Sequence, residues 1–232
     1  MPQLIWKEWH EQSWRLGFGC LVLSALALIG LRSRMIDDES MIIFVCFLGV
    51  ALLPVLSSTG LVPAERSDGS LESLLALPVT PRLILAAKTA MGILLSAGPL
   101  LVAGGVSILV AGGREMTTDS MFALYARSAL AASSLFIWML ALTIRLPNET
   151  RAGLLAVGLL IFWILATGGL SDPSIPPLLF AVSPFAFVYM RKTGEQVMTV
   201  SPVLTVLVEQ AGIVVLLWVW ASRRLAGAEG ES

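Results

Sequence analysis

Residues 40–64 read SMIIFVCFLGVALLPVLSSTGLVPA, a run of twenty-five positions without a charged side chain. A helix that crosses the ~30 Å hydrocarbon core of a bilayer needs about 20 mainly apolar residues. Five further apolar blocks, each with at most one charged side chain, occupy about 16–32, 83–112, 121–144, 152–171 and 203–222. We therefore predict an all-α membrane protein in which residues 1–232 form a single domain with six transmembrane helices.

The overall composition excludes several other classes of protein. Of the 232 residues, 56% are hydrophobic and only 13% are charged, the net charge is −1 and the mean hydropathy is +0.85. A soluble domain carries about 25% charged residues, so a soluble enzyme, a disordered chain and an electrostatic nucleic-acid binder are all excluded. Cys20 and Cys46 are too few for a disulfide scaffold, and His10 leaves no histidine cluster for a metal site or an intramembrane enzyme.

A seventh apolar stretch, residues 173–190, carries four prolines. Proline in a helix interior costs about 3 kcal/mol, so this stretch is a poor spanning helix. We predict that residues 172–202 form an external re-entrant or broken helical region before the last span.

Basic residues predict the orientation of the chain in the membrane, because cytoplasmic loops carry the excess of Lys and Arg. With six spans, one side would hold nine basic residues and the other five. The larger number lies on the side of both tails. Both termini are therefore expected in the cytoplasm, in a multi-pass protein of the cytoplasmic (inner) membrane.

The first fifteen residues predict an amphipathic helix that lies in the membrane interface. On a helical wheel one face would carry Ile5, Trp6, Trp9 and Ser13. The opposite face would carry Lys7, Glu8, His10, Glu11 and Arg15. The alternative is a polar tail with a few aromatic interface anchors.

The connection between the second and third spans contains a short predicted helix. Residues 65–88 read ERSDGSLESLLALPVTPRLILAAK. Asp68-Gly69 is a turn signal, and Ser70 is a suitable N-cap for a helix that Pro78 would end. Thr80 followed by Pro81 predicts the start of the next helix.

The short helix would carry an apolar stripe of three leucines, Leu71, Leu74 and Leu75, at helical spacing. A helix of two turns is not stable alone in water. The leucines must therefore be covered by the bilayer surface, by the first helix or by another protein.

These residues resemble the second connecting loop of type-2 ABC exporter permeases. The shared elements are Glu65-Arg66, Gly69-Ser70-Leu71-Glu72, Leu74-Leu75, Leu77-Pro78-Val79 and a closing Lys88. The start Ile5-Trp6-Lys7-Glu8-Trp9 also resembles the interfacial connecting helix of that family.

The resemblance implies that the 65–82 loop holds a cytoplasmic coupling helix seated in a cleft of a separate ATPase subunit. The implied coupling residues are Glu65, Arg66, Gly69, Ser70, Leu71, Glu72, Leu74, Leu75 and Pro78. The chain lacks the Gly-x-x-x-x-Gly-Lys-[Ser/Thr] phosphate loop. It is therefore expected to bind no cofactor itself, while ATP and magnesium would bind to the partner ATPase. A second permease subunit, in a homodimer or a heterodimer, is also implied.

Two charged residues fall within predicted spans, Arg127 in the fourth and Glu209 in the sixth. An intramembrane charge is a candidate functional residue, and its partner should be named. We predict an Arg127–Glu209 pair that braces these spans or lines an external vestibule. The alternative is that each side chain extends to the interface independently.

The leading interpretation is the membrane subunit of an ATP-driven exporter. One alternative is a permease of the haem-exporter type that serves cytochrome c maturation. Another is a non-transporting subunit that relays ATPase motion. Few strongly polar groups occur in the spans, which favours an apolar or amphipathic cargo over a bare ion.

Overall fold

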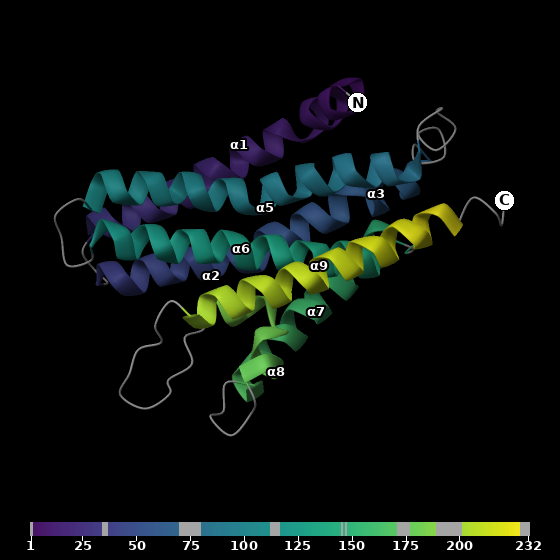
Figure 1. The fold of residues 1–232 in the computed structure, drawn as a ribbon. Helices are drawn as coiled ribbons and strands as arrows, with labels where there is room; N and C mark the ends of the chain where they lie inside the picture. The colour runs from purple at the N-terminus through teal and green to yellow at the C-terminus, as the bar shows by residue number, and fades with distance from the viewer. Residues whose placement is uncertain are drawn as a thin grey trace.

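A computed structural model describes residues 2–33, 37–69, 80–111, 117–144, 146, 148–170, 177–188 and 201–227 (Figure 1). All of its regular elements in these ranges are helical. They are α1 (Pro2–Ser33), α2 (Asp38–Leu61), α3 (Pro63–Ser67), α5 (Pro81–Ala111), α6 (Thr118–Thr143), α7 (Glu149–Leu170), α8 (Pro177–Ala181), the 3₁₀ helix η1 (Pro184–Phe187) and α9 (Ser201–Gly227).

Six of these helices are long and apolar enough to cross a membrane. They are α1, α2, α5, α6, α7 and α9, so the six predicted spans are confirmed in number and approximate position. The described part of the proline-rich stretch, residues 177–188, forms only α8 and η1. These two short helices pack against α6, α7 and α9 and add no seventh span.

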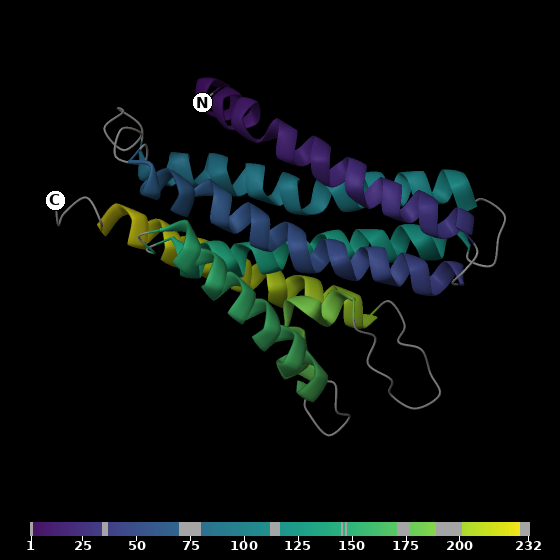
Figure 2. The ribbon, with the colours of Figure 1, turned by 180° about the vertical axis from the view of Figure 1, so that it is seen from behind.

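Helix α6 lies at the centre of the packing, in contact with α2, α5, α7 and α9 (Figures 1 and 2). Small side chains allow this close approach, since Ala131 and Ala132 are completely buried. On the facing helix, a Cβ atom at Gly92 would lie 1.9 Å from the ring of buried Phe136. The aromatic ring therefore packs directly on the backbone of α5, where only glycine fits.

The two ends of the bundle differ in what they contain. Helix α1 begins and α9 ends at the same end, where α3 also lies and α5 begins (Figure 1). We call this the terminal end and the opposite one the far end. An even number of spans requires this arrangement. That the terminal end faces the cytoplasm stays a prediction.

The N-terminal segment differs from the expectation of a separate interfacial helix. Helix α1 runs without a break from Pro2 to Ser33, over 32 residues. At 1.5 Å per residue it is about 48 Å long, well beyond the ~30 Å of a hydrocarbon core. Its first turns therefore extend the spanning helix, and both are one element.

Candidate functional site

Lys88 lies in the second turn of α5 and is one of the largest fully buried side chains, 1% exposed. Its ammonium nitrogen lies 2.8 Å from Oε1 of Glu8 and 2.7 Å from Oε2 of Glu65. It also donates to the backbone carbonyl of Leu61 at 3.1 Å. The ammonium thus donates hydrogen bonds to Glu8 and to the Leu61 carbonyl, and it forms an ion pair with Glu65.

The break between α2 and α3 supplies one of these partners. Helix α2 ends at Leu61, and Pro63 begins α3, where its missing N–H costs nothing. The last carbonyls of a helix have no partner within the helix. Lys88 donates a hydrogen bond to the carbonyl of Leu61. Its positive charge also interacts favourably with the negative end of the α2 helix dipole.

A second lysine lies at the edge of the same group. The ammonium nitrogen of Lys7 lies 3.5 Å from Oε1 of Glu65 and 3.5 Å from Oε1 of Glu11. Carboxylate oxygens of Glu8, Glu11 and Glu65 lie within 4.8 Å of one another. The three carboxylates repel one another, and the ammonium groups of Lys7 and Lys88 offset this repulsion. We call Lys88, Glu8, Glu65 and Lys7 the ionic cluster.

The ionic cluster fastens three separate elements together at the terminal end. Glu8 comes from α1, Glu65 from α3 and Lys88 from α5, and Glu8 and Lys88 are 80 positions apart. Removing one partner of a buried ion pair leaves an uncompensated charge and costs about 3–5 kcal/mol. The cluster therefore holds α1, α3 and α5 as one unit.

The residues flanking the predicted coupling helix are partly described. Asp68 and Gly69 form the predicted turn, in which Gly69 has a left-handed φ of +73°. Helix α5 begins at Pro81 as predicted, and the carbonyl of Thr80 accepts the first helical hydrogen bonds. The remaining predicted coupling residues lie outside the described residues: Ser70, Leu71, Glu72, Leu74, Leu75 and Pro78. Arg66 belongs to α3, and its side chain also lies outside the description.

The predicted polar face of the N-terminal segment is divided by the structure. Trp6 and Trp9 are exposed, as an interface contact requires, and so are His10 and Glu11. Glu8, by contrast, is only 1% exposed. Its placement on an outward polar face is wrong, because the buried ammonium of Lys88 draws it into the bundle. The side chain of Ile5 lies outside the described residues.

The predicted Arg127–Glu209 pair is not confirmed. Both side chains are half-buried, and among the described residues no ion pair joins them. The neighbouring Gln210 is instead buried in the interior of the bundle. Its Nε2 donates to the carbonyls of Ala181 and Val182 at 2.6 and 2.9 Å.

Gln210 also joins α9 to α6, because its Oε1 accepts a hydrogen bond of 2.5 Å from Ser134. A further bond of 2.5 Å links the hydroxyls of Thr167 on α7 and Ser183, just before η1. We call Gln210, Ser134, Thr167 and Ser183 the amide–hydroxyl network. These uncharged groups fix residues 177–188 among three helices.

The sequence interpretation did not assign a contact to Lys88 or to Gln210. A single charge inside the apolar 83–112 block was the available signal for Lys88. The signal at Gln210 was a polar amide in an apolar helix, next to the charged Glu209.

Residues 7–167 match the family described as ABC-2 family transporter protein. The matched range includes the whole ionic cluster and five of the six long helices. A comparison with curated proteins gives no match.

Proposed function

We propose, from the premise that this chain belongs to the ABC-2 transporter family, that it is the permease of an exporter driven by a separate ATPase chain. Membership of the family makes the chain a multi-pass membrane subunit of a transporter and not itself the catalytic chain. The direction of transport, the coupling to ATP and the partners are parts of the proposal.

The observation that carries the proposal is the position of the ionic cluster relative to the 65–82 loop. Glu65 lies just before the loop's central residues, and Lys88 lies about two turns into the helix that follows them. Their side chains meet at 2.7 Å, and both groups reach α1, Lys88 through Glu8 and Glu65 through Lys7. A displacement of the loop would therefore move α1, α3 and α5 together.

The proposed cycle uses this connection as its mechanical link. ATP binding would bring two partner ATPases together, and each loop would move with the ATPase cleft that holds it. The apolar contacts with that cleft would be made by Leu71, Leu74 and Leu75. Packed helices have few alternative arrangements, so the spans would change access largely as rigid bodies. Two copies of the chain, or two related permeases, would enclose the path.

Affinity purification of the tagged full-length chain from native membranes tests the proposal. We expect a chain with a phosphate-loop ATPase domain to co-purify with ATP-hydrolysing activity. Leu74→Asp and Leu75→Asp should each reduce its recovery at least tenfold, because a carboxylate cannot be buried in an apolar seat.

Thr80→Asp is the matched control, since Thr80 is exposed and lies within the loop but outside the leucine stripe. Its recovery of the ATPase should equal that of the native chain. The proposal would be contradicted if both leucine variants recovered as much of the ATPase as the native chain does. It would also be contradicted if no such ATPase co-purified with the native chain.

A further inference from the structure

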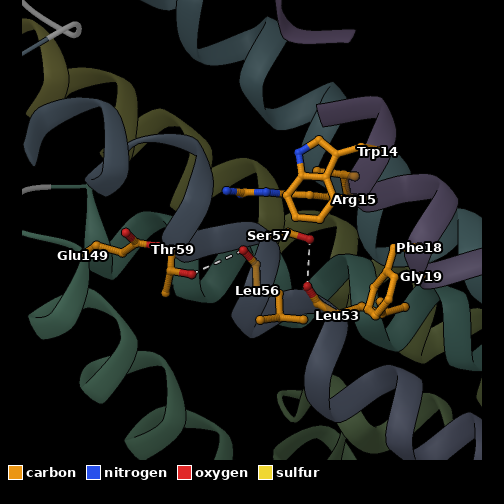
Figure 3. A pocket seen from close by; sticks show the side chains of 10 residues that line it. Trp14, Arg15, Phe18, Gly19, Leu53, Leu56, Ser57, Thr59 and Glu149 are labelled. Carbon is orange, nitrogen blue, oxygen red and sulfur yellow. Dashed lines mark hydrogen bonds between the residues drawn. The ribbon is translucent and has the colours of Figure 1, made fainter. Parts of the chain in front are cut away.

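A cavity of about 340 Å³ lies between α1, α2 and α5, and the first residue of α7 lies at its side (Figure 3). Its wall is mainly apolar, with Trp14 and Phe18 from α1 and Leu56 from α2. These three side chains are more than 60% exposed, so the cavity opens to the outside of the bundle. Its volume lies within the range of about 300–1,000 Å³ that is usual for small-ligand sites.

Arg15 lines this cavity, and its position is set by a glycine. A Cβ atom at Gly60 would lie 1.7 Å from Nη1 of Arg15, so the guanidinium occupies the place of an absent side chain on α2. The ring of Trp14 lies 5.6 Å from the guanidinium carbon. Among the ion pairs of the described residues, none includes Arg15. The cavity thus contains a positioned cation without a carboxylate partner.

Glu149, at the start of α7, lines the same cavity from the other side. Thr59 lies between Arg15 and Glu149 in the close view (Figure 3). Its hydroxyl donates to the carbonyls of Val55 and Leu56, at 3.1 and 3.3 Å. The proton of Thr59 is therefore engaged, and its oxygen can accept a hydrogen bond. One side of the cavity offers donors and the other offers acceptors.

We propose that this cavity binds a zwitterionic amphiphile, a molecule with an apolar chain and a head group that carries an anion next to an ammonium. Arg15 would hold the phosphate or carboxylate through charge-assisted hydrogen bonds. Glu149 and the oxygen of Thr59 would accept from the ammonium. The apolar chain would lie along Trp14 and Phe18. The site is inferred from its own side chains and does not depend on the exporter proposal.

Equilibrium binding to the purified full-length chain in a neutral detergent tests the site. The probes are lysophosphatidylethanolamine and lysophosphatidylglycerol, which share the chain and the phosphate and differ in the ammonium. The native chain should prefer the ethanolamine probe. Arg15→Gln should lower the affinity for both probes at least tenfold. Glu149→Gln should lower the affinity for the ethanolamine probe alone and so abolish the preference.

Two matched controls separate binding from folding. Gly60→Ala keeps the charge of Arg15 but displaces the guanidinium, so it should weaken both probes. Gly17→Ala adds the same methyl group where nothing lies within 4 Å, and it should leave binding unchanged. Arg32→Gln removes an exposed charge at the other end of α1 and should also have no effect.

Equal binding of the two probes to the native chain would overturn the proposal, and so would full binding by Arg15→Gln or Gly60→Ala. Vesicles of phosphatidylcholine with or without phosphatidylethanolamine identify the source of the natural ligand. Displacement of the probe by phosphatidylethanolamine would assign the site to a bilayer lipid. Retention of the probe would assign it to a free single-chain amphiphile, such as a transported one.

Discussion

Two regions of the bundle are held together by different chemistry. At the terminal end the ionic cluster joins α1, α3 and α5 through buried charges, with contacts of 2.7 and 2.8 Å to Lys88. In the interior of the bundle the amide–hydroxyl network joins α6, α7, α9 and residues 177–188 through neutral groups. Both regions connect elements that are distant in the sequence.

The difference bears on how each of the two regions responds to force. A buried charge that loses its partner is far more costly than a neutral hydrogen bond, which contributes about 0.5–1.5 kcal/mol net. The helices at the terminal end should therefore move together or not at all. The amide–hydroxyl network can exchange one neutral bond for another at little cost. The proposed coupling through the 65–82 loop requires such a stiff connection at the terminal end.

The largest effect is expected from Lys88→Met, which fills the same volume and removes the charge. Glu8 and Glu65 would then be buried beside each other without their shared cation. We expect a destabilisation of about 3–5 kcal/mol, measured as a large fall in the thermal midpoint of the purified chain. Lys7→Met is the matched control, because Lys7 is 37% exposed and such pairs contribute about 0–1 kcal/mol. Equal midpoints for the two variants would contradict the assignment of the stabilisation to the buried charge of Lys88.

An intermediate effect is expected from Gln210→Leu in the amide–hydroxyl network. The variant leaves the carbonyls of Ala181 and Val182 and the hydroxyl of Ser134 without their partner, at a cost of about 1–3 kcal/mol. Limited proteolysis should also cut residues 177–188 faster. Glu209→Gln, one position away and half-buried, is the control and should change neither measurement. A loss larger than that of Lys88→Met would reverse the comparison.

The smallest effect is expected at the start of α2, at the far end. The carboxylate of Asp37 caps this helix by accepting from the backbone amide of Ser40 at 2.8 Å, and this bond lowers the pKa of Asp37. The stabilisation by the cap is complete above the ordinary aspartate pKa of about 3.9 and is lost as the pH falls through the lowered value.

Amide hydrogen exchange in the first turn of α2 measures this cap. Asp37→Ala should speed exchange at pH 7, and the difference from the native chain should shrink as the pH falls into the acid range. Glu39→Ala, exposed in the same turn, should leave the exchange nearly unchanged. A difference that grows on acidification would contradict the assigned sign.

The spans, and the turns and helix starts between them, were predictable because they depend on residues that are close in the sequence. The apolar blocks predicted six long helices, the Asp68-Gly69 pair predicted a turn, and Pro81 predicted the start of α5. The predicted helix over residues 70–77, on which the coupling hypothesis depends, lies outside the described residues and stays a prediction.

The buried polar contact of α9 was not predictable from the charges. Arg127 and Glu209 were predicted to pair because they are charged and lie within spans, and this pairing stays unconfirmed, while Gln210 makes the buried hydrogen bonds of α9. Successive residues on a helix point about 100° apart, so one position decides whether a side chain faces the bundle. The rotation of α9 about its own axis, which decides this, cannot be predicted from a single sequence.

Length and hydrophobicity by themselves determined that this chain crosses the membrane six times, because the hydrocarbon core sets how many apolar residues a span requires. The tertiary structure alone decided that Glu8 turns inward to Lys88 and that Gly60 makes room for Arg15. Each of these contacts joins positions more than forty residues apart. Their distance depends on how the helices rotate and pack, which no local pattern of the sequence specifies.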